Sequence, residues 1–215
     1  MRIICLSDIH GSYARANAIL KAERFDVLLI AGDLTTFGTA QEASSALESF
    51  MEHGKPVVGV AGNMDPPFLE EVFERLNVSI NGRGKIVQGV GFFGVSASPP
   101  TPLNTPYEIS EDEIADRALR GWRETQGAKR RIFVPHAPPS DSSVDLLKDG
   151  RHVGSSSVRK FVEEFQPDAL VCGHIHEARG TDKLGNTEIV NCGPAGKGYY
   201  AIIEINDRVE VRLNG

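Results

Sequence analysis

The sequence predicts an α/β (α+β) fold in which a mixed β-sheet, or two packed β-sheets, is flanked by helices. In the N-terminal part, short and continuously apolar runs alternate with longer amphipathic segments. The C-terminal tail instead alternates apolar with charged residues. The first pattern is typical of parallel β/α units with buried strands, and the second of an antiparallel hairpin. No Pro-, Gly- or Ser-rich linker divides the 215 residues, so one domain over residues 1–215 is expected.

The N-terminal part is predicted to contain three buried strands separated by two helices. Apolar runs at Ile3–Leu6, Val27–Ile30 and Val57–Val60 predict the strands. The Ala/Leu/Glu-rich segments Ala14–Ala22 and Ala40–Met51 predict the helices. Right-handed crossovers make such strands parallel. The polar residues after each strand should therefore meet at the edge where open α/β sheets bind ligands.

The middle of the chain is predicted to be less regular. Ile86–Val87 and Phe92–Val95 are separated by glycines and indicate a hairpin. The four prolines of Ser98–Pro106 indicate an irregular surface loop, which could overhang a site at the sheet edge. Ser110, followed by Glu113, resembles a capping box that opens a helix running towards Trp122.

The last third of the chain is predicted to return to strands. Apolar runs indicate strands at Ile132–Val134, Ala169–Cys172 and Glu188–Val190, and a helix at Ser155–Phe165 ends before a proline. The alternating tail, residues 199–213, indicates a hairpin that turns at Asn206 and Asp207.

Composition narrows the class of protein. The net charge is −6, and the only tight basic cluster, Lys129–Arg131, precedes a strand, where a solvated strand entry is the favoured interpretation. This balance argues against a nonspecific nucleic-acid binder. The cysteines, Cys5, Cys172 and Cys192, are odd in number and far apart, so no disulfide framework is implied. No stretch has the length of a signal peptide core or a membrane span, and a cytoplasmic location is expected.

Five short polar motifs each follow a predicted strand. Each motif alone is more typical of a turn, a helix cap or a half-buried histidine than of a ligand. Together they place four of the six histidines, two aspartates and an asparagine just beyond buried strands, often beside a glycine that lets the backbone approach an ion. This joint pattern predicts a metal site. The motifs are Asp8-Ile9-His10, Gly32-Asp33, Gly62-Asn63-Met64-Asp65, His136, and Gly173-His174-Ile175-His176.

In this order and spacing, the motifs resemble the calcineurin-like metallophosphoesterases, whose signature is D-x-H, G-D, G-N-H-[DE], a later His and G-H-x-H. The small size resembles the compact phosphodiesterase branch, which implies a sandwich of two mixed sheets between helices (αββα). The resemblance implies that Asp33 bridges two divalent metal ions and that a hydroxide between them attacks the phosphate ester. The implied ligands are Asp8, His10 and His176 at one ion, and Asn63, His136 and His174 at the other.

Nitrogen and oxygen ligands without thiolates suit Mn²⁺, our first choice, as well as Fe, Ni²⁺ or Zn²⁺. The resulting expectation is a hydrolase, most of all a phosphodiesterase, with Asp33 and Asn63 among the catalytic residues. Its substrate would be a small-molecule or nucleotide-like phosphoester; the acidic balance disfavours nucleic acid as a partner, and no membrane partner is expected. The alternatives are a nuclease and a non-catalytic interaction scaffold of the same fold. A homodimer is expected only because members of the resembled family form homodimers.

The sequence departs from the family signature at Met64. The histidine usual at this position is thought to protonate the leaving oxygen or to stabilise charge in the transition state, and a thioether has no proton to give. Two weaker signals accompany the motifs. Asp65 is interpreted as a cap for a helix that starts at Pro66 and Pro67. His152, which precedes a helix N-terminus that could contact substrate phosphate, is a tentative substitute proton donor, although an ordinary capped helix with an exposed histidine is the commoner meaning of such a pattern.

Overall fold

The N-terminal β/α units form the centre of the first of two sheets in the computed structural model, which describes residues 1–215. The strands β1 (Arg2–Leu6), β2 (Val27–Ala31) and β3 (Val57–Val60) are parallel neighbours. The crossovers are the helices α1 (Tyr13–Ala22) and α2 (Ala40–Met51). The predicted order of strands and helices in this part of the chain is confirmed.

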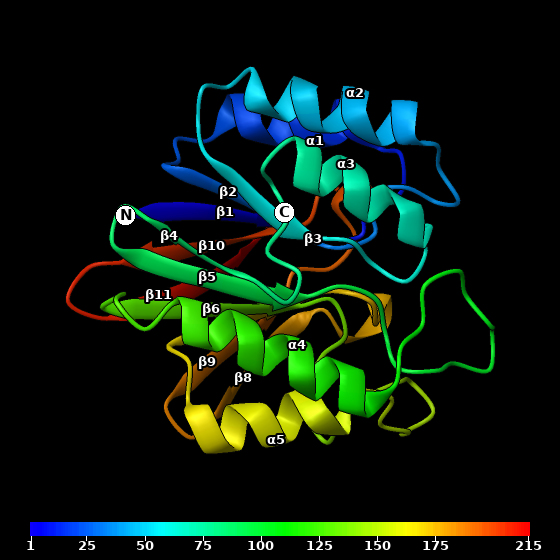
Figure 1. Ribbon diagram of the computed structural model, residues 1–215, viewed down its shortest axis with the longest axis vertical. Helices are drawn as coiled ribbons and strands as arrows, with labels where there is room; N and C mark the ends of the chain where they lie inside the picture. Colours follow the sequence, from blue (N-terminus) through cyan, green and yellow to red (C-terminus); the bar gives the residue numbers. More distant parts are fainter.

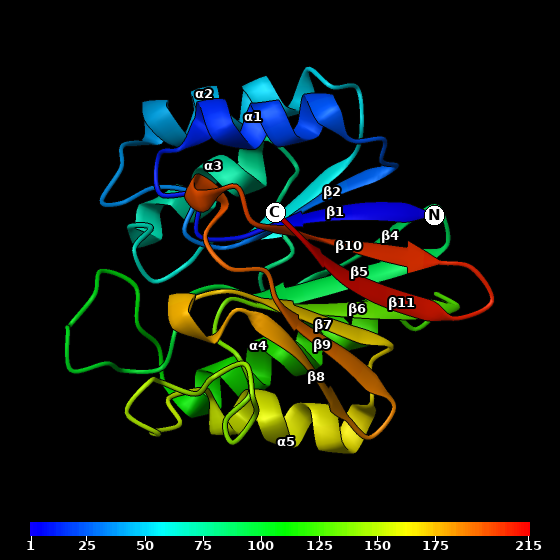
Figure 2. The same ribbon diagram turned by 180° about the vertical axis from the view of Figure 1, so that it is seen from behind.

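The C-terminal hairpin completes the first sheet. β10 (Tyr200–Ile205) pairs antiparallel with β1, and β11 (Val209–Asn214) pairs antiparallel with β10, which gives the order β11-β10-β1-β2-β3. Seen from behind, the hairpin lies directly beside β1 (Figure 2). Because β10 runs opposite to β1, the turn at Asn206 and Asp207 lies at the edge away from the carboxyl ends of the parallel strands.

The second sheet has six strands, of which the outer two are the antiparallel arms of hairpins and the inner four are parallel. Strand β8 was not predicted, because Asp182 and Lys183 interrupt any apolar pattern and its side chains are only half-buried or exposed. In spatial order the strands are β4 (Gly84–Val87), β5 (Val90–Val95), β6 (Arg130–Pro135), β7 (Ala169–Cys172), β9 (Thr187–Asn191) and β8 (Gly180–Leu184).

Alternate side chains of the central strands face two different cores. On β1, Ile3 and Cys5 belong to a cluster of 19 buried residues drawn from both sheets. Ile4 and Leu6 belong to a cluster of 36 buried residues that includes the helix-facing side chains. Strands buried on both faces are continuously apolar for this reason. All three cysteines are buried and free.

The helices form the outer layers of the sandwich. Figure 1 shows α1, α2 and α3 (Glu70–Arg75) over the first sheet, and α4 (Glu111–Glu124) and α5 (Ser156–Phe165) over the second. The predicted αββα arrangement is therefore confirmed. Three short 3₁₀ turns complete the elements: η1 (Pro67–Leu69), η2 (His176–Ala178) and η3 (Ala195–Lys197).

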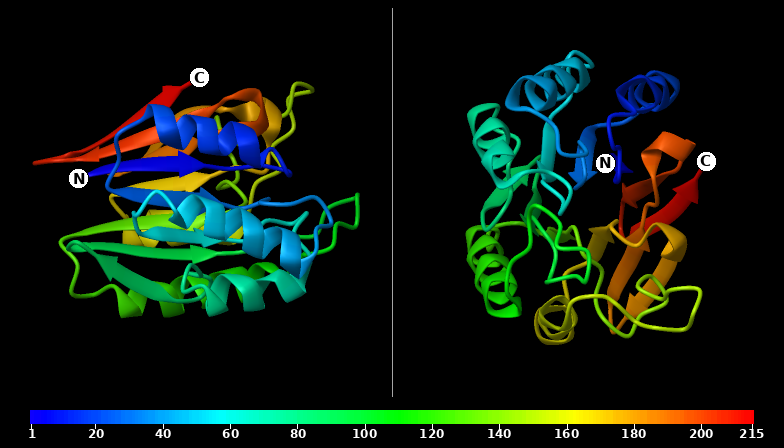
Figure 3. Two further views of the ribbon diagram at one scale, coloured as in Figure 1. Left: turned by 90° about the horizontal axis from the view of Figure 1, so that it is seen from above. Right: turned by 90° about the vertical axis from the view of Figure 1, so that its right-hand side faces the viewer.

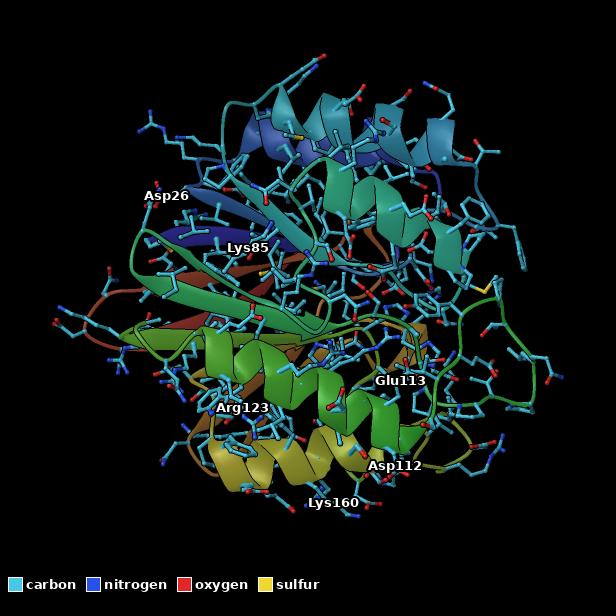
Figure 4. The ribbon with its side chains drawn as sticks, viewed as in Figure 1. Asp26, Lys85, Asp112, Glu113, Arg123 and Lys160 are labelled. Atoms are coloured by element: carbon cyan, nitrogen blue, oxygen red, sulfur yellow. The ribbon has the colours of Figure 1, made fainter.

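The predicted capping box of α4 is only half formed. The Ser110 hydroxyl accepts the Glu113 N–H at 3.2 Å, as predicted, but the Glu113 carboxylate pairs with Arg117 and does not return to Ser110. Figure 4 shows Asp112 and Glu113 at one end of α4 and Arg123 at the other. Acidic residues in the first turn and basic ones in the last complement the helix dipole.

Candidate metal centre

Five strands deliver polar side chains to one edge of the sandwich, where their carboxyl ends meet. In Figure 3 (right panel) this edge faces the viewer, and the loops after the strands surround it. The strands are β1, β2, β3, β6 and β7, and the side chains are those of Asp8, His10, Asp33, Asn63, His136, His174 and His176. All seven residues predicted to be ligands come together here.

Asp8, His10 and His176 form one group. Their potential ligand atoms all lie within 4.8 Å of one another. His176 Nε2 lies 3.2 Å from Asp8 Oδ1 and 3.3 Å from His10 Nε2. At that distance the two imidazole nitrogens can share at most one proton. A metal cation bound by the lone pairs of both nitrogens and by the Asp8 carboxylate suits this geometry better than a shared proton does.

Asn63, His136 and His174 form the second group. The side-chain oxygen of Asn63 lies 3.0 Å from His136 Nε2 and 2.8 Å from His174 Nδ1. Asn63 and His136 are buried, and His174 is half-buried. This group therefore offers two nitrogens and one oxygen in a buried environment.

Asp33 lies between the two groups. Its Oδ2 is 3.5 Å from His10 Nε2 of the first group and 3.4 Å from His136 Nε2 of the second. Asp8 also reaches both sides, because Asp8, Asp33 and His136 likewise have ligand atoms within 4.8 Å of one another. The sequence had placed Asp8 in the first group only, since no spacing rule indicates how far a carboxylate reaches across an edge.

The charges of this site fit divalent cations. Asp8 Oδ2 is buried and has no hydrogen-bond partner. Nothing in the protein therefore offsets the free-energy cost of removing this carboxylate oxygen from water, whereas a bound cation would. Burial lowers the pKa of His136, but the Asp33 carboxylate outweighs it and raises that pKa to about 9. Burial and the neighbouring His136 lower the pKa of His174 to about 4. The unpartnered Asp8 oxygen and the clustered imidazole nitrogens are donors that divalent cations compensate, so the residues fit the metals that the sequence pattern implies.

Two histidines are oriented by hydrogen bonds on the nitrogen that faces away from the site. His136 Nδ1 lies 2.8 Å from the Ala31 carbonyl oxygen, to which it donates in the tautomer that leaves Nε2 free. His10 Nδ1 lies 2.8 Å from Thr36 Oγ1. Partners of this kind fix the ring orientation of metal-binding histidines. Thr36 and the backbone of Ala31 carried no signal in the sequence.

Backbone strain is concentrated in the same residues. Four of the seven, Asp8, His10, Asp33 and His174, have φ between 46° and 66°. This left-handed region is uncommon outside glycine, although Asp and His enter it more readily than most residues. Strained residues cluster at functional sites because the surrounding structure holds them in place.

Three glycines make room for ligands that arrive from other strands. A Cβ on Gly32 would lie 2.2 Å from His136 Nδ1, one on Gly62 2.1 Å from Asp33 Oδ1, and one on Gly173 2.3 Å from Asp8 Oδ2. Each glycine precedes a ligand of its own strand and faces a ligand of another. All three glycines are therefore required by space, and Gly32, with φ of +94°, by backbone conformation as well.

Asp65 has a different role from the one predicted. It does not cap the following helix: Pro66 precedes η1, and no side chain caps that turn. Instead the fully buried Asp65 carboxylate accepts the N–H groups of Leu34, Thr35 and Gly62 at 2.7–3.0 Å. Asp65 thereby ties the loop that carries Asp33 to the loop that carries Asn63. Burial and the nearby Asp33 charge both raise its pKa.

The helix N-terminus near His152 cannot take a substrate phosphate as it stands. The Glu111 carboxylate accepts the N–H groups of Ser156 and Ser157 at 3.0 and 2.9 Å, and Ser155 caps the helix. The ordinary capped helix, the interpretation favoured by the sequence, is therefore what the structure has, and Glu111 of α4 occupies the N–H groups that could have contacted phosphate.

His152 itself is held by a buried partner that the sequence did not reveal. His152 Nδ1 lies 2.6 Å from Asp145 Oδ1, and Asp145 is fully buried whereas 38% of the His152 side chain is exposed. The hydrogen bond to Asp145 raises the pKa of His152. No hydrogen bond joins His152 to the seven residues of the metal centre, so its role stays a prediction.

Two further loops support the ligand edge. The stems of the proline-rich loop attach beside Asn63, since Tyr107 N donates to the Asn63 carbonyl and Ala97 N to the Ala61 carbonyl, each at 3.1 Å. The side-chain amide of Asn191 donates to the Ile175 carbonyl at 2.9 Å and so holds the His174–His176 loop. None of the helices has the length and apolarity that a bilayer span requires.

Comparison with known proteins agrees with this architecture. Residues 1–178 match the family model described as calcineurin-like phosphoesterase. The chain is 36% identical over 207 residues to an uncharacterized protein of Methanocaldococcus jannaschii, a match that covers 93% of this chain and 90% of the relative. It is 27% identical over 219 residues to a UPF0046 protein of Caenorhabditis elegans, covering 92% and 71% of the two chains.

Among solved structures, TT1561 of Thermus thermophilus has the same fold, with a TM-score of 0.77, 16% identity and coverage of 99% of this chain and 97% of that one. The 5'-nucleotidase of Candida albicans shares the fold over half its length, with a TM-score of 0.60, 13% identity and coverage of 99% and 50%. Because the family model spans most of the chain, the resemblance read from the motifs is confirmed: the chain belongs to the calcineurin-like phosphoesterase family, and its candidate site is that of a metal-dependent phosphoesterase.

Proposed function

We propose that residues 1–215 act as one domain that hydrolyses phosphodiesters of small or nucleotide-like molecules with two divalent metal ions, Mn²⁺ first among them. Asp33 would bridge the ions, with Asp8, His10 and His176 at the first and Asn63, His136 and His174 at the second. When bound, the ions supply a hydroxide nucleophile at neutral pH and offset charge on the phosphoryl oxygens. The observation that supports this most is the position of Asp33 Oδ2, within 3.5 Å of one histidine from each group.

The chain's own residues orient and shield this chemistry. Asp65 holds together the two loops that carry Asp33 and Asn63, and the burial of Asn63 and His136 keeps bulk water away from the second group. The unpartnered oxygen of Asp8 and the left-handed backbone of the ligands mean that the edge is already shaped for cations before they arrive. A scaffold protein of the same fold would have no need to keep all seven donors.

Metal removal tests the proposal. Metal-stripped protein is expected to leave bis-p-nitrophenyl phosphate intact, and added Mn²⁺ is expected to restore turnover, because no side chain of the site is placed to replace the ions as the source of the nucleophile. Release of p-nitrophenol is followed by absorbance, and circular dichroism verifies that the stripped protein stays folded. Stoichiometric Mn²⁺ binding without turnover of any phosphodiester would contradict the proposal and favour an interaction scaffold, with partner pull-down as the next step.

Met64 predicts a dependence on the leaving group. Its N–H donates to Asp33 Oδ1 at 2.8 Å, so the backbone function of this position is kept while the side chain supplies no proton. General acid help is worth about 10²–10⁴-fold. Aryl esters and activated diesters should therefore be hydrolysed faster than alkyl monoesters by a factor in that range. Initial rates on a matched series of aryl and alkyl phosphates measure the factor, and equal rates would refute the prediction.

We propose that His152 partly replaces the general acid that Met64 cannot supply. Asp145 binds Nδ1, which leaves Nε2 of the partly exposed ring free to donate a proton when the imidazole is protonated. His152→Gln and Asp145→Asn are expected to slow hydrolysis of alkyl esters by about 10²-fold and of aryl esters far less. The same kinetic series measures both. An equal loss for both kinds of ester would show that the pair only maintains the structure of its loop.

A further inference from the structure

Exposed apolar side chains gather on the loops around the candidate metal centre, and we propose that they bind a hydrocarbon group of the phosphoester substrate. The inference rests on the proposed function and narrows its substrate class. Six large apolar side chains of the protein are exposed, and four of them lie on loops that follow strands at the ligand edge. These four are Phe37, Phe68, Leu103 and Leu146.

Each of the four lies in the connection that follows a strand at the ligand edge. Phe37, 63% exposed, lies four residues after Asp33, Phe68, 52% exposed, lies in η1, five residues after Asn63, and Leu146, 40% exposed, lies ten residues after His136. Leu103 is 80% exposed on the proline-rich loop, whose stem hydrogen-bonds to the Asn63 backbone. In Figure 1 these loops leave the sandwich on the same side, next to the carboxyl ends of β2, β3 and β5. Single exposed apolar residues need no explanation, but a group around a catalytic edge does.

The backbone of Phe37 is held in a strained conformation. Its φ is +55°, a conformation in which a bulky side chain is a genuine outlier. Its N–H donates to the Met64 carbonyl at 3.0 Å, which holds the Phe37 backbone next to that of the residue that replaces the family histidine. The strain does not bury the aromatic ring in the free protein. An exposed ring on a strained backbone is typical of a residue that holds a ligand.

Met64 extends the same apolar character to the reacting end of the site. Its backbone is bonded to both Asp33 and Phe37, and its half-buried thioether is flexible and apolar. The sequence difference that removes a proton donor thus puts an apolar side chain at a position whose backbone links Asp33 to Phe37. A sugar or a charged group would find no hydrogen-bond partner in these side chains, whereas an alkyl or aryl ester group would be removed from water.

Alkylphosphonates test the proposal, because they present a phosphoryl group and a chain and are not hydrolysed. Calorimetric titration of the Mn²⁺-loaded protein compares methylphosphonate with hexylphosphonate. Each methylene removed from water should tighten binding about fourfold, so partial burial of the chain should favour hexylphosphonate at least about tenfold. Phe37→Ser and Leu103→Ser should each reduce this ratio at least about threefold without weakening methylphosphonate. Met51→Ser and Ile86→Ser, which change exposed apolar side chains at the end of α2 and on β4, are the matched controls and should keep the ratio.

The outcomes separate this proposal from the proposed function. Equal affinities for the two phosphonates, or an equal loss in the control variants, would overturn the hydrocarbon subsite even in an active phosphodiesterase. A protein that prefers hexylphosphonate and hydrolyses nothing would keep the subsite and overturn the proposed activity. Adsorption to phosphatidylcholine vesicles without any preference among soluble phosphonates would make the apolar loops a membrane contact and would likewise overturn the subsite.

Discussion

Asp33→Asn is expected to abolish metal-dependent hydrolysis of bis-p-nitrophenyl phosphate. Asp33 Oδ2 lies 3.4 Å from His136 Nε2 and 3.5 Å from His10 Nε2, so both groups of donors lose their shared anionic oxygen in the variant. Only Asp8 would then remain as a carboxylate among the seven donors. Changing a partner in the second sphere of a metal site already costs about 10–100-fold in affinity or activity. Loss of a bridging carboxylate should therefore exceed 100-fold and reduce the metal content below two ions per chain, as measured by elemental analysis.

The fold of the metal-free variant should be intact. Asn keeps an oxygen that can accept the Met64 N–H, and loss of the Asp33 charge relieves the repulsion that raises the pKa of Asp65. The thermal unfolding midpoint without metal is therefore expected to stay close to that of the wild type. Asp207→Asn, in the exposed turn between β10 and β11 at the opposite edge, is the matched control. Full activity of Asp33→Asn with two bound ions would show that the two groups do not share this carboxylate.

The strand ends were predictable because each shows two local signals, a continuous apolar run and a polar residue just after it. Runs such as Val27–Ala31 are apolar at every position, as a short strand buried on both faces requires, and a polar residue follows within two positions. Parallel topology then forces these polar residues to one edge. The positions of Asp33 and Asn63 needed no knowledge of side-chain contacts for this reason.

The interactions that depend on contacts between distant segments were not predictable. Asp65 resembled a helix cap because Pro66 and Pro67 follow it, yet its partners are Leu34 and Thr35, some thirty residues away along the chain. A local motif carries no information about such a partner. At the N-terminus of α5 the Ser155 cap was the favoured interpretation, but the contact with Glu111 was not foreseen, because Glu111 reaches it from another helix.

Weakly apolar elements were also missed. The edge strand β8 has alternating half-buried and exposed side chains, and its pairing with β9 comes from the backbone. The left-handed backbone of Asp8 and His174 leaves no trace in composition, because neither residue type requires it.

Gly62→Ala is expected to lose metal binding and stability together. The new Cβ would lie 2.1 Å from Asp33 Oδ1 and 2.3 Å from the Asp33 backbone nitrogen. The Asp33 side chain could turn away from the new methyl group, but the Asp33 backbone nitrogen cannot. The loop that carries Asp33 and the loop that carries Asn63 must therefore move apart. That movement also strains the Gly62 N–H bond to Asp65, which is 2.8 Å long. Overpacking of this kind costs about 1–3 kcal/mol, and the displaced Asp33 should weaken metal binding at least about tenfold.

Gly180→Ala is the matched control for this variant. Its Cβ would have no neighbour nearer than 3.7 Å, on the edge strand β8. Thermal unfolding of the metal-free proteins measures the packing cost, and Mn²⁺ titration measures the displacement of the ligands. If Gly62→Ala lowers stability but binds Mn²⁺ as the wild type does, the loops absorb the new methyl group without moving Asp33. The glycine would then be required for packing alone. If stability and affinity fall together, the space left by the missing Cβ is what allows a carboxylate from β2 to approach the ligand that follows β3.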